Sequence, residues 1–227
     1  MKNNEEILIA TSNKGKVKEF KKLFQTHNIF SLTDLGIVDA VEDGSSFLEN
    51  ALIKAKHGAK ESKRYSISDD SGLVVPGLNF EPGIFSARYA GDKASDRENR
   101  DKIIKKLNEK NVDALDAYYV CVLVGMRDEN DPIPIIAQGK IHGKVSIHSS
   151  GEGGFGYDKI FYPNDYSCSM ASIDQDIKNK ISHRAIATKR FMEIFNNQLW
   201  RFFIVKYINF SSFVIPSLFK LCQSILF

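Results

Sequence analysis

Two adjacent acids, Asp69 and Asp70, precede Ser71 and Gly72, and this short run offers the clearest chemistry in the chain. Neighbouring carboxylates can hold a hard divalent cation or accept a proton from water. Glu42 lies beside a glycine turn just ahead of a predicted helix, so the three acids are expected to converge on one magnesium ion. The alternative is structural, with Asp69 to Gly72 forming an Asx-type turn between two strands and Glu42 a solvated loop charge.

A lysine-bearing loop follows the first apolar run of the chain, Ile7 to Ala10. The loop consists of Thr11, Ser12, Asn13, Lys14, Gly15 and Lys16. Apolar residues recur at helical spacing from Val17 onward, so the loop should connect a buried strand to a helix. Backbone N–H groups at the start of a helix, with lysines nearby, favour a phosphate-binding site. The loop does not match the P-loop pattern, however, and a solvated turn is the alternative.

Glycines occupy four of the six positions from 151 to 156, and Phe155, Tyr157 and Asp158 stand among or next to them. Glycine lets a backbone approach a ligand closely. The two aromatic rings offer a stacking surface for a planar base, and Asp158 offers a hydrogen-bond acceptor. The alternative is a glycine-rich loop whose aromatic side chains fill the core.

Three basic residues, Lys178, His183 and Arg184, lie at or just before the predicted start of the last helix. Positive charge at a helix N-terminus opposes the macrodipole and costs stability unless an anion or a carbonyl compensates it. A local conflict of this kind is expected at a functional site. Alternatively, Arg184 pairs with an acid from elsewhere in the chain.

The elements that must position these residues alternate between helices and strands, which predicts an α/β fold with a mixed sheet. Helices should begin near Ser46 and Ser95, because each is followed three residues later by a glutamate in capping-box spacing. A last helix should follow His183 and Arg184. The expected strands, besides Ile7 to Ala10, are Ser66 to Ser68, Leu73 to Val75, Ala117 to Met126 and a hairpin pair within Ile133 to Ile147.

The composition is that of a folded protein, with 227 residues of which 43% are hydrophobic and 26% charged. These values exclude a disordered or collagenous chain. Cys121, Cys168 and Cys222 stand far apart, which argues against a disulfide framework or a structural zinc site. Residues 1–197 contain 28 basic and 28 acidic side chains, so their charge does not favour nucleic-acid binding. The start of the chain lacks the pattern of a signal peptide, and a cytoplasmic location is expected.

Residues 198–227 differ from the rest of the chain, because they are rich in apolar side chains and contain no acid. Their longest uncharged run, Tyr207 to Phe219, has 13 residues and includes Pro216. A membrane-spanning helix needs about 20 apolar residues. We therefore expect no membrane span, and predict a domain at residues 1–197 followed by an extension at 198–227 that packs on the body or is poorly ordered.

Six segments in this order resemble the Ham1/inosine-triphosphate pyrophosphatase family across residues 7–197. They are Thr11–Lys16, Phe47–Ala55, Asp69–Gly72, Pro82–Gly91, Gly153–Asp158 and Ser182–Arg184. The resemblance implies an elongated, two-lobed α/β structure around a long curved mixed sheet, and usually a homodimer. It also implies magnesium-dependent hydrolysis of purine nucleoside triphosphates that carry hypoxanthine or xanthine (ITP, dITP and XTP), yielding the monophosphate and pyrophosphate.

The resemblance also implies roles for individual residues. Asp70 is expected to be the metal-linked general base, Glu42 a magnesium ligand and Lys54 a contact to the phosphates. The residues expected to bind substrate are Thr11, Ser12, Asn13, Lys14, Gly15, Lys16, Ser71, Phe155, Gly156, Tyr157, Asp158, Lys178, His183 and Arg184. The chain departs from the common family pattern at Ser12, Lys159 and Ser172, and these departures remove none of the residues to which the resemblance assigns chemistry.

Discrimination between purines is expected at the 6-position of the base. Hypoxanthine and xanthine present a carbonyl there, to which an arginine can donate, whereas adenine presents an amino group. A buried donor left unpaired costs about 1–3 kcal/mol. Two alternatives stay open at this point, namely a pyrophosphatase of broader specificity and a nucleotide-binding sensor without turnover. The presence of Asp70, Glu42 and Lys54 argues against the sensor.

Overall fold

The structure is a computed structural model that describes residues 6–24 and 27–210. The chain divides into two compact units, Met1–Phe191 and Met192–Phe227. The first unit holds the sheet and all the site residues predicted above. In the second unit the described residues are helical and end at Phe210, so most of the run Tyr207 to Phe219 lies outside the described residues. Among the helices that are described, none is both long and apolar enough to cross a membrane.

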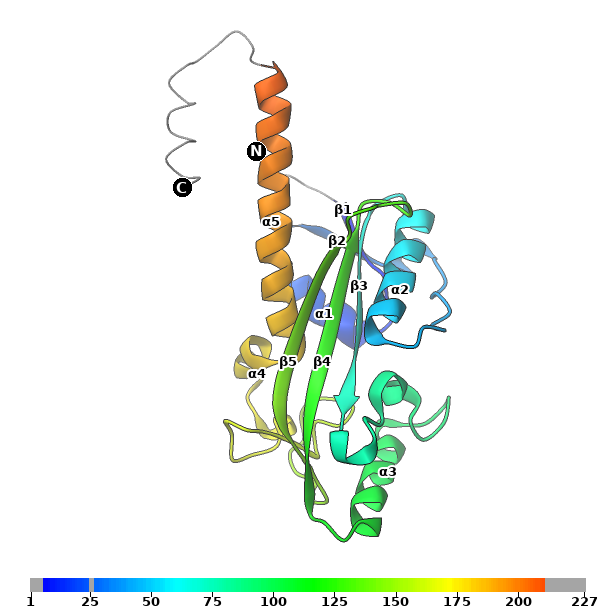
Figure 1. The fold of residues 1–227 in the computed structure, drawn as a ribbon, viewed down its shortest axis with the longest axis vertical. Helices are drawn as coiled ribbons and strands as arrows, with labels where there is room; N and C mark the ends of the chain where they lie inside the picture. Colours follow the sequence, from blue (N-terminus) through cyan, green and yellow to red (C-terminus); the bar gives the residue numbers. More distant parts are fainter. Residues whose placement is uncertain (1–5, 25–26, 211–227) are drawn as a thin grey trace. The chain divides into compact units, whose positions relative to one another are not determined.

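A mixed sheet forms the centre of the first unit, and its described strands follow the order β2-β1-β3-β4-β5-β6. The strands β1 (Glu6–Ile9), β2 (Asn28–Ser31) and β3 (Tyr65–Val74) pair in parallel. The pairs from β3 through β4 (Ala114–Met126), β5 (Ile135–Ser146) and β6 (Phe161–Pro163) are antiparallel. The long strands β4 and β5 connect the region around α1 and α2 to the region around α3 (Figure 1). The predicted α/β class with a mixed sheet is therefore confirmed.

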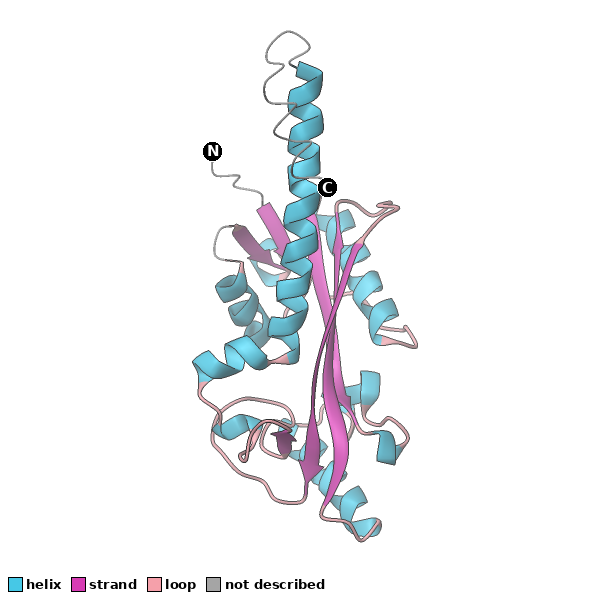
Figure 2. Cartoon of the chain, turned by 60° about the vertical axis from the view of Figure 1, so that its left-hand side comes forward, coloured by secondary structure: helices cyan, strands magenta, loops and turns pink. Residues whose placement is uncertain are grey.

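Figure 2 shows the helices of the chain in cyan. Several of them begin next to a residue whose side chain caps the helix. Ser46 caps α2 (Phe47–Ser62), and Ser95 caps α3 (Asp96–Glu109) with a complete capping box, as predicted. Asn13 caps α1 (Lys14–Leu23) by accepting from two backbone N–H groups, and α5 (His183–Phe210) includes His183 and Arg184, which were expected just before or at its start. The sequence did not predict the short elements β2, β6 and α4 (Gln175–Ile181).

The segment from Asp69 to Gly72 is not a turn, contrary to the structural alternative. It lies inside the continuous strand β3 and pairs with β4, with Asp69 opposite Leu123 and Asp70 opposite Val122. Gly72 is needed for space, because a Cβ atom there would lie 2.3 Å from Ser86 Oγ. The two strands expected on either side of this run, Ser66 to Ser68 and Leu73 to Val75, therefore belong to one strand up to Val74.

The hairpin predicted within Ile133 to Ile147 was also wrong. This segment is one strand, β5, which forms a hairpin with β4 instead. Its two glycines allow close packing and do not form turns. A Cβ atom on Gly139 would lie 2.1 Å from the His183 carbonyl oxygen, and one on Gly143 would lie 2.2 Å from the Tyr162 carbonyl oxygen.

Small side chains let helix α2 lie close to the sheet. Ala51, Ala55 and Ala59 are buried against valines of β4, including Val122 and Val124. Alanine loses no rotamer freedom on burial and keeps a helix tightly packed. This packing sets the distance between α2 and β3, and so positions the α2 side chains that reach Asp70.

Candidate active site

The predicted site residues gather where the parallel strands β1 and β3 stop pairing. The last residue of β1, Ile9, pairs with Ile67, and the Ala10 N–H donates to the Ile67 carbonyl oxygen at 2.8 Å. Beyond this point β1 leads into the loop at residues 11–13, while β3 continues into Asp69 and Asp70. The carboxyl ends of parallel strands are the usual place for ligands in open α/β sheets.

Asp69 and Asp70 lie in different surroundings, because successive side chains of a strand point to opposite faces. Asp69 Oδ2 lies 3.0 Å from Lys16 Nζ and accepts a hydrogen bond from Ser71 Oγ at 3.1 Å. Asp70 Oδ1 instead accepts from Lys54 Nζ at 3.2 Å. The expectation that Asp69 joins Asp70 and Glu42 around one cation was wrong. No group of three acid, histidine or cysteine side chains suited to a metal occurs among residues 6–24 and 27–210.

Lys54 joins Asp70 to Glu42. Its Nζ donates to Glu42 Oε1 at 2.8 Å and to Asp70 Oδ1 at 3.2 Å, and its side chain is only 8% exposed. The second Asp70 oxygen accepts from Asn50 Nδ2 at 3.4 Å, and Glu42 Oε2 lies 3.9 Å from Arg88 Nη1. Two carboxylates from different elements thus face one buried positive charge.

The pKa values of Asp69 and Asp70 shift in opposite directions. Burial raises the pKa of Asp70, an effect that the positive charges of Lys54 and Lys16 only partly offset. Burial also disfavours the charged form of Asp69, but the nearby Lys16 and Arg184 outweigh it and lower the pKa of Asp69. The carboxylates of Asp70, Asp69 and Glu42 raise the pKa of Lys54 in spite of its burial. Asp70 is therefore the better proton acceptor of the pair, and Asp69 a fixed negative charge.

Arg184 pairs with acids from elsewhere in the chain, which was the predicted alternative to ligand binding. Its Nη1 forms an ion pair with Glu19, its Nη2 donates to Ser71 Oγ at 3.2 Å, and its Nε lies 3.5 Å from Asp69 Oδ2. Arg184 is 2% exposed, so these contacts compensate a buried charge at the start of α5. Glu19 was not among the site residues predicted from the sequence. Its signal was the spacing to Lys16, because residues three apart share one face of a helix.

The loop from residue 11 to 16 uses its own acceptors for several backbone N–H groups. The N–H groups of Gly15 and Lys16 donate to Asn13 Oδ1 at 2.9 and 3.1 Å. The Asn13 N–H donates to Thr11 Oγ1 at 3.2 Å. In addition, the Ser12 N–H donates to Asp39 Oδ1, and Lys14 is exposed. Thr11 and Asn13 therefore shape the loop, and the helix start is capped by a side chain.

Helix α3 holds the glycine-rich loop through the backbone N–H and carbonyl groups of Gly156. The Gly156 N–H donates to Asp96 Oδ2 and Arg100 Nη1 donates to the Gly156 carbonyl oxygen, each at 2.7 Å. Gly156 has a φ angle of +59° and Gly154 one of +76°, which favour glycine at both positions. Neither Asp96 nor Arg100 was among the site residues predicted from the sequence.

The two aromatic residues of this loop have opposite roles. Phe155 is 46% exposed, and its ring centroid lies 5.4 Å from Lys178 Nζ and 5.9 Å from Arg184 Cζ. Tyr157 is buried in the core, where its hydroxyl donates to the Ser86 carbonyl oxygen at 2.8 Å. The expectation that the Tyr157 ring lines a base pocket was wrong, and its alternative holds, whereas Phe155 offers an exposed ring.

Asp158 and His183 both contact other side chains of the protein. Asp158 Oδ2 accepts from Lys178 Nζ and, at 3.0 Å, from the Phe155 N–H, so this acid fixes the loop and a lysine together. The His183 ring stacks on Tyr119 with centroids 4.8 Å apart. Burial and the neighbouring Arg184 charge hold the pKa of His183 well below its usual range, so its ring is neutral at pH 7.

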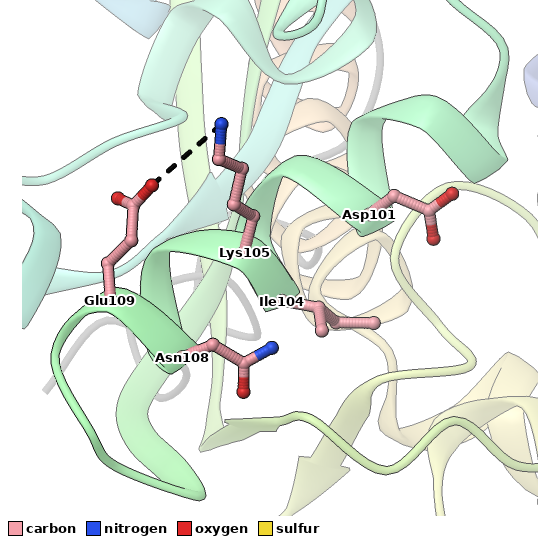
Figure 3. A pocket seen from close by; sticks show the side chains of 5 residues that line it. All are labelled: Asp101, Ile104, Lys105, Asn108 and Glu109. Atoms are coloured by element: carbon pink, nitrogen blue, oxygen red, sulfur yellow. Dashed lines mark ion pairs between the residues drawn. The ribbon is translucent and has the colours of Figure 1, made fainter.

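A surface pocket lies elsewhere, along α3. Figure 3 shows its lining side chains, which all come from this one helix and include the ion pair Lys105–Glu109 at 3.9 Å. None of the predicted site residues lines it. The charged residues described above, and not this pocket, form the candidate active site of the α/β fold.

The comparisons with known proteins identify the family. The model of the Ham1 family matches residues 7–194. A dITP/XTP pyrophosphatase of Legionella pneumophila is 48% identical over 182 residues, covering 80% of this chain and 94% of its own length. One from Acinetobacter baylyi is 44% identical over 193 residues, covering 82% and 92%.

Solved structures agree with this assignment. A HAM1 protein from Coxiella burnetii is 37% identical with a TM-score of 0.80, covering 85% of this chain and 99% of its own. The Ham1 protein of Staphylococcus aureus is 36% identical with a TM-score of 0.76, covering 86% and 100%. The chain belongs to the Ham1 family.

Proposed function

We propose that the chain hydrolyses ITP, dITP and XTP to the nucleoside monophosphate and pyrophosphate, and so removes these nucleotides from the cellular pool. The observation that carries this proposal is the group formed by Glu42, Lys54 and Asp70, two carboxylates around a buried lysine in a Ham1-family chain. The names of the relatives, dITP/XTP pyrophosphatases, support the choice of substrates.

The donor set at Glu42 and Asp70 fits a divalent cation, and we propose Mg²⁺. Both side chains supply carboxylate oxygens, and a positive charge already lies between them. Magnesium is commonly bound through one or two carboxylates, with substrate phosphates and water completing its shell. When bound, the ion would neutralise negative charge on the phosphates.

Asp70 is proposed as the general base. It would accept a proton from the water whose oxygen attacks the α-phosphorus, while the bond from that phosphorus to the bridging oxygen breaks and pyrophosphate leaves. Its raised pKa suits this role, because a base works best when its pKa approaches the working pH. Lys54, together with Lys16, would stabilise the charge that develops on the leaving pyrophosphate.

The base is proposed to stack on Phe155, whose ring is the exposed aromatic surface of the glycine-rich loop. Lys178 and Arg184 lie over that ring, and His183, which stacks on Tyr119, directly precedes Arg184 in the chain. Because Arg184 already contacts Glu19 and Asp69, we propose that these acids aim its guanidinium at the 6-carbonyl of the purine. If Arg184 instead served the phosphates, Arg184→Ala would lower activity on ITP and ATP equally.

The rest of the proposal concerns the whole chain. We propose that residues 1–197 form the catalytic domain, that 198–227 form an extension, and that the enzyme works in the cytoplasm as a homodimer. The family match, which ends at residue 194, supports this division of the chain.

A pyrophosphate-release assay tests the proposed function. The purified chain should act on ITP, dITP and XTP with a kcat/KM well above that for ATP and GTP. Activity should disappear in excess EDTA and return when Mg²⁺ is added. Equal kcat/KM values for all five nucleotides would indicate a broad pyrophosphatase, tight binding without turnover would indicate a sensor, and full activity in EDTA would exclude the metal.

A further inference from the structure

The Lys54 ammonium occupies the place between the two carboxylates proposed to hold the metal. It lies 2.8 Å from Glu42 Oε1 and 3.2 Å from Asp70 Oδ1. The Lys54 side chain is 8% exposed and that of Asp70 9%, so water contributes little to either charge. Asn50, which is fully buried, holds the second oxygen of Asp70 at 3.4 Å. The protein thus neutralises this acid pair with its own cation.

The ammonium and a divalent cation cannot occupy this place together. Magnesium binds oxygen at about 2.0–2.1 Å and accepts only near-octahedral geometry. An ion bound to both Glu42 and Asp70 would lie within a few ångströms of the Lys54 Nζ, and like charges at that distance in a buried site repel strongly. Lysine has a flexible four-carbon stem, so its ammonium can move while α2 stays in place.

We propose that Lys54 is an internal counter-ion that competes with the divalent cation for Glu42 and Asp70, and keeps metal affinity low in the nucleotide-free enzyme. Metal entry displaces the ammonium, which then becomes available to the substrate phosphates. The inference rests on the proposed function in one respect, the choice of Glu42 and Asp70 as metal ligands. It adds that Lys54 first competes with the metal and then contacts the substrate phosphates.

Binding of Mn²⁺ to the nucleotide-free protein, measured by electron paramagnetic resonance, tests the competition. Lys54→Met keeps most of the side-chain volume and removes the charge, so it should bind Mn²⁺ about tenfold more tightly than the wild type. Lys56→Met removes an exposed lysine from the same helix and should leave the affinity unchanged. Equal Mn²⁺ affinity in Lys54→Met and wild type, including no binding by either, would overturn the inference.

A second measurement uses the wild-type chain and does not depend on the folding of a variant. Acetylation of individual lysines, followed by peptide mass mapping, should be slow at Lys54 without metal and faster in saturating Mn²⁺. The rate at Lys56 should not change. An unchanged rate at Lys54 would show that its ammonium stays between the carboxylates, and would contradict the inference.

These results are separable from the assay of function. Hydrolysis of dITP together with equal Mn²⁺ affinities would reject the counter-ion and leave the proposed function standing. Tighter Mn²⁺ binding by Lys54→Met, together with no nucleotide hydrolysis by the wild type, would support the counter-ion and reject the proposed function.

Discussion

At the scale of single residues, Asp69 and Asp70 are neighbours in the chain but lie in two different electrostatic surroundings. Asp69 faces Lys16 and Arg184 and is fully buried among them, whereas Asp70 faces Lys54 and Glu42 on the other side of β3. Burial favours the neutral form of Asp70, because it raises the pKa of that carboxyl. The charge of Asp69 is required by its neighbours, because they lower its pKa.

Substituting each aspartate by asparagine should therefore give opposite results. Asp70→Asn should lower kcat about a hundredfold to ten-thousandfold, with an unfolding free energy equal to or above that of the wild type. Asp69→Asn breaks a buried ion pair and should lower the unfolding free energy by about 3–5 kcal/mol. Urea denaturation and pyrophosphate release measure the two effects. Near-normal hydrolysis by Asp70→Asn, or an undiminished stability of Asp69→Asn, would contradict these assignments.

At the scale of elements, helix α3 acts as a support for the loop that carries Phe155. Asp96 and Arg100, one helical turn apart, bind the N–H and the carbonyl of the Gly156 peptide units. Because both side chains bind the backbone of the loop, we regard them as positioning residues. Their contribution depends on the rigidity of α3, whose start is fixed by the capping box at Ser95.

Asp96→Ala should loosen this loop and raise KM for ITP several-fold, with a smaller effect on kcat. The reason is that the loop contributes binding surface, while Asp70 and Lys54 lie on β3 and α2. Asp101→Ala removes another exposed acid from α3 and serves as the control. Steady-state kinetics on ITP measure the split, and an equal KM in Asp96→Ala and wild type would exclude the supporting role.

The turn between β4 and β5 is held by an ion pair whose contribution depends on pH. Arg127 pairs with Asp131, and this hydrogen bonding to Arg127 lowers the pKa of Asp131 from 3.8 to about 2. Because the folded-state pKa is the lower one, the ionised carboxylate stabilises the fold at pH values above 3.8. That stability is lost as the pH falls from 3.8 to about 2.

Asp131→Asn should therefore lower the melting temperature at pH 7, and the difference from wild type should shrink over this acidic range. Thermal unfolding followed by circular dichroism across the pH series measures it. Asp116→Asn, which changes an exposed acid on β4, should show little difference at any pH. A melting-temperature difference for Asp131→Asn that stays constant down to pH 2 would refute the ion-pair explanation.

At the scale of the whole molecule, the catalytic function should reside in residues 1–197. The family match ends at residue 194. About 85% of this chain accounts for 99% of the HAM1 protein from Coxiella burnetii, so that relative folds without a comparable extension.

A chain that ends at Asn197 should keep the kcat/KM of the full chain for ITP. Pyrophosphate release by the two purified proteins, compared at equal concentration, measures this. A soluble, folded truncation with greatly reduced activity would assign a catalytic contribution to residues 198–227.

The sequence by itself determined the features that depend on neighbours along the chain. Ser46 and Ser95 predicted two helix starts correctly, because a cap and its partner lie within four residues. The order of the motifs likewise predicted the family, because residue types and their order can be recognised without knowing which residues contact each other. Glu42, Lys54 and Asp70 of the candidate site were found in this way, as was the alternation of helices and strands.

Only the tertiary structure decided which of these residues face each other. Arg184 and its partner Glu19 are separated by 165 positions, and Lys54 reaches Asp70 across 16, so no local pattern pairs them. Glycine favours turns, but Gly72, Gly139 and Gly143 lie within the strands β3 and β5. They are instead places where another segment approaches the sheet too closely for a Cβ atom, and such an approach is a property of packing between distant parts of the chain.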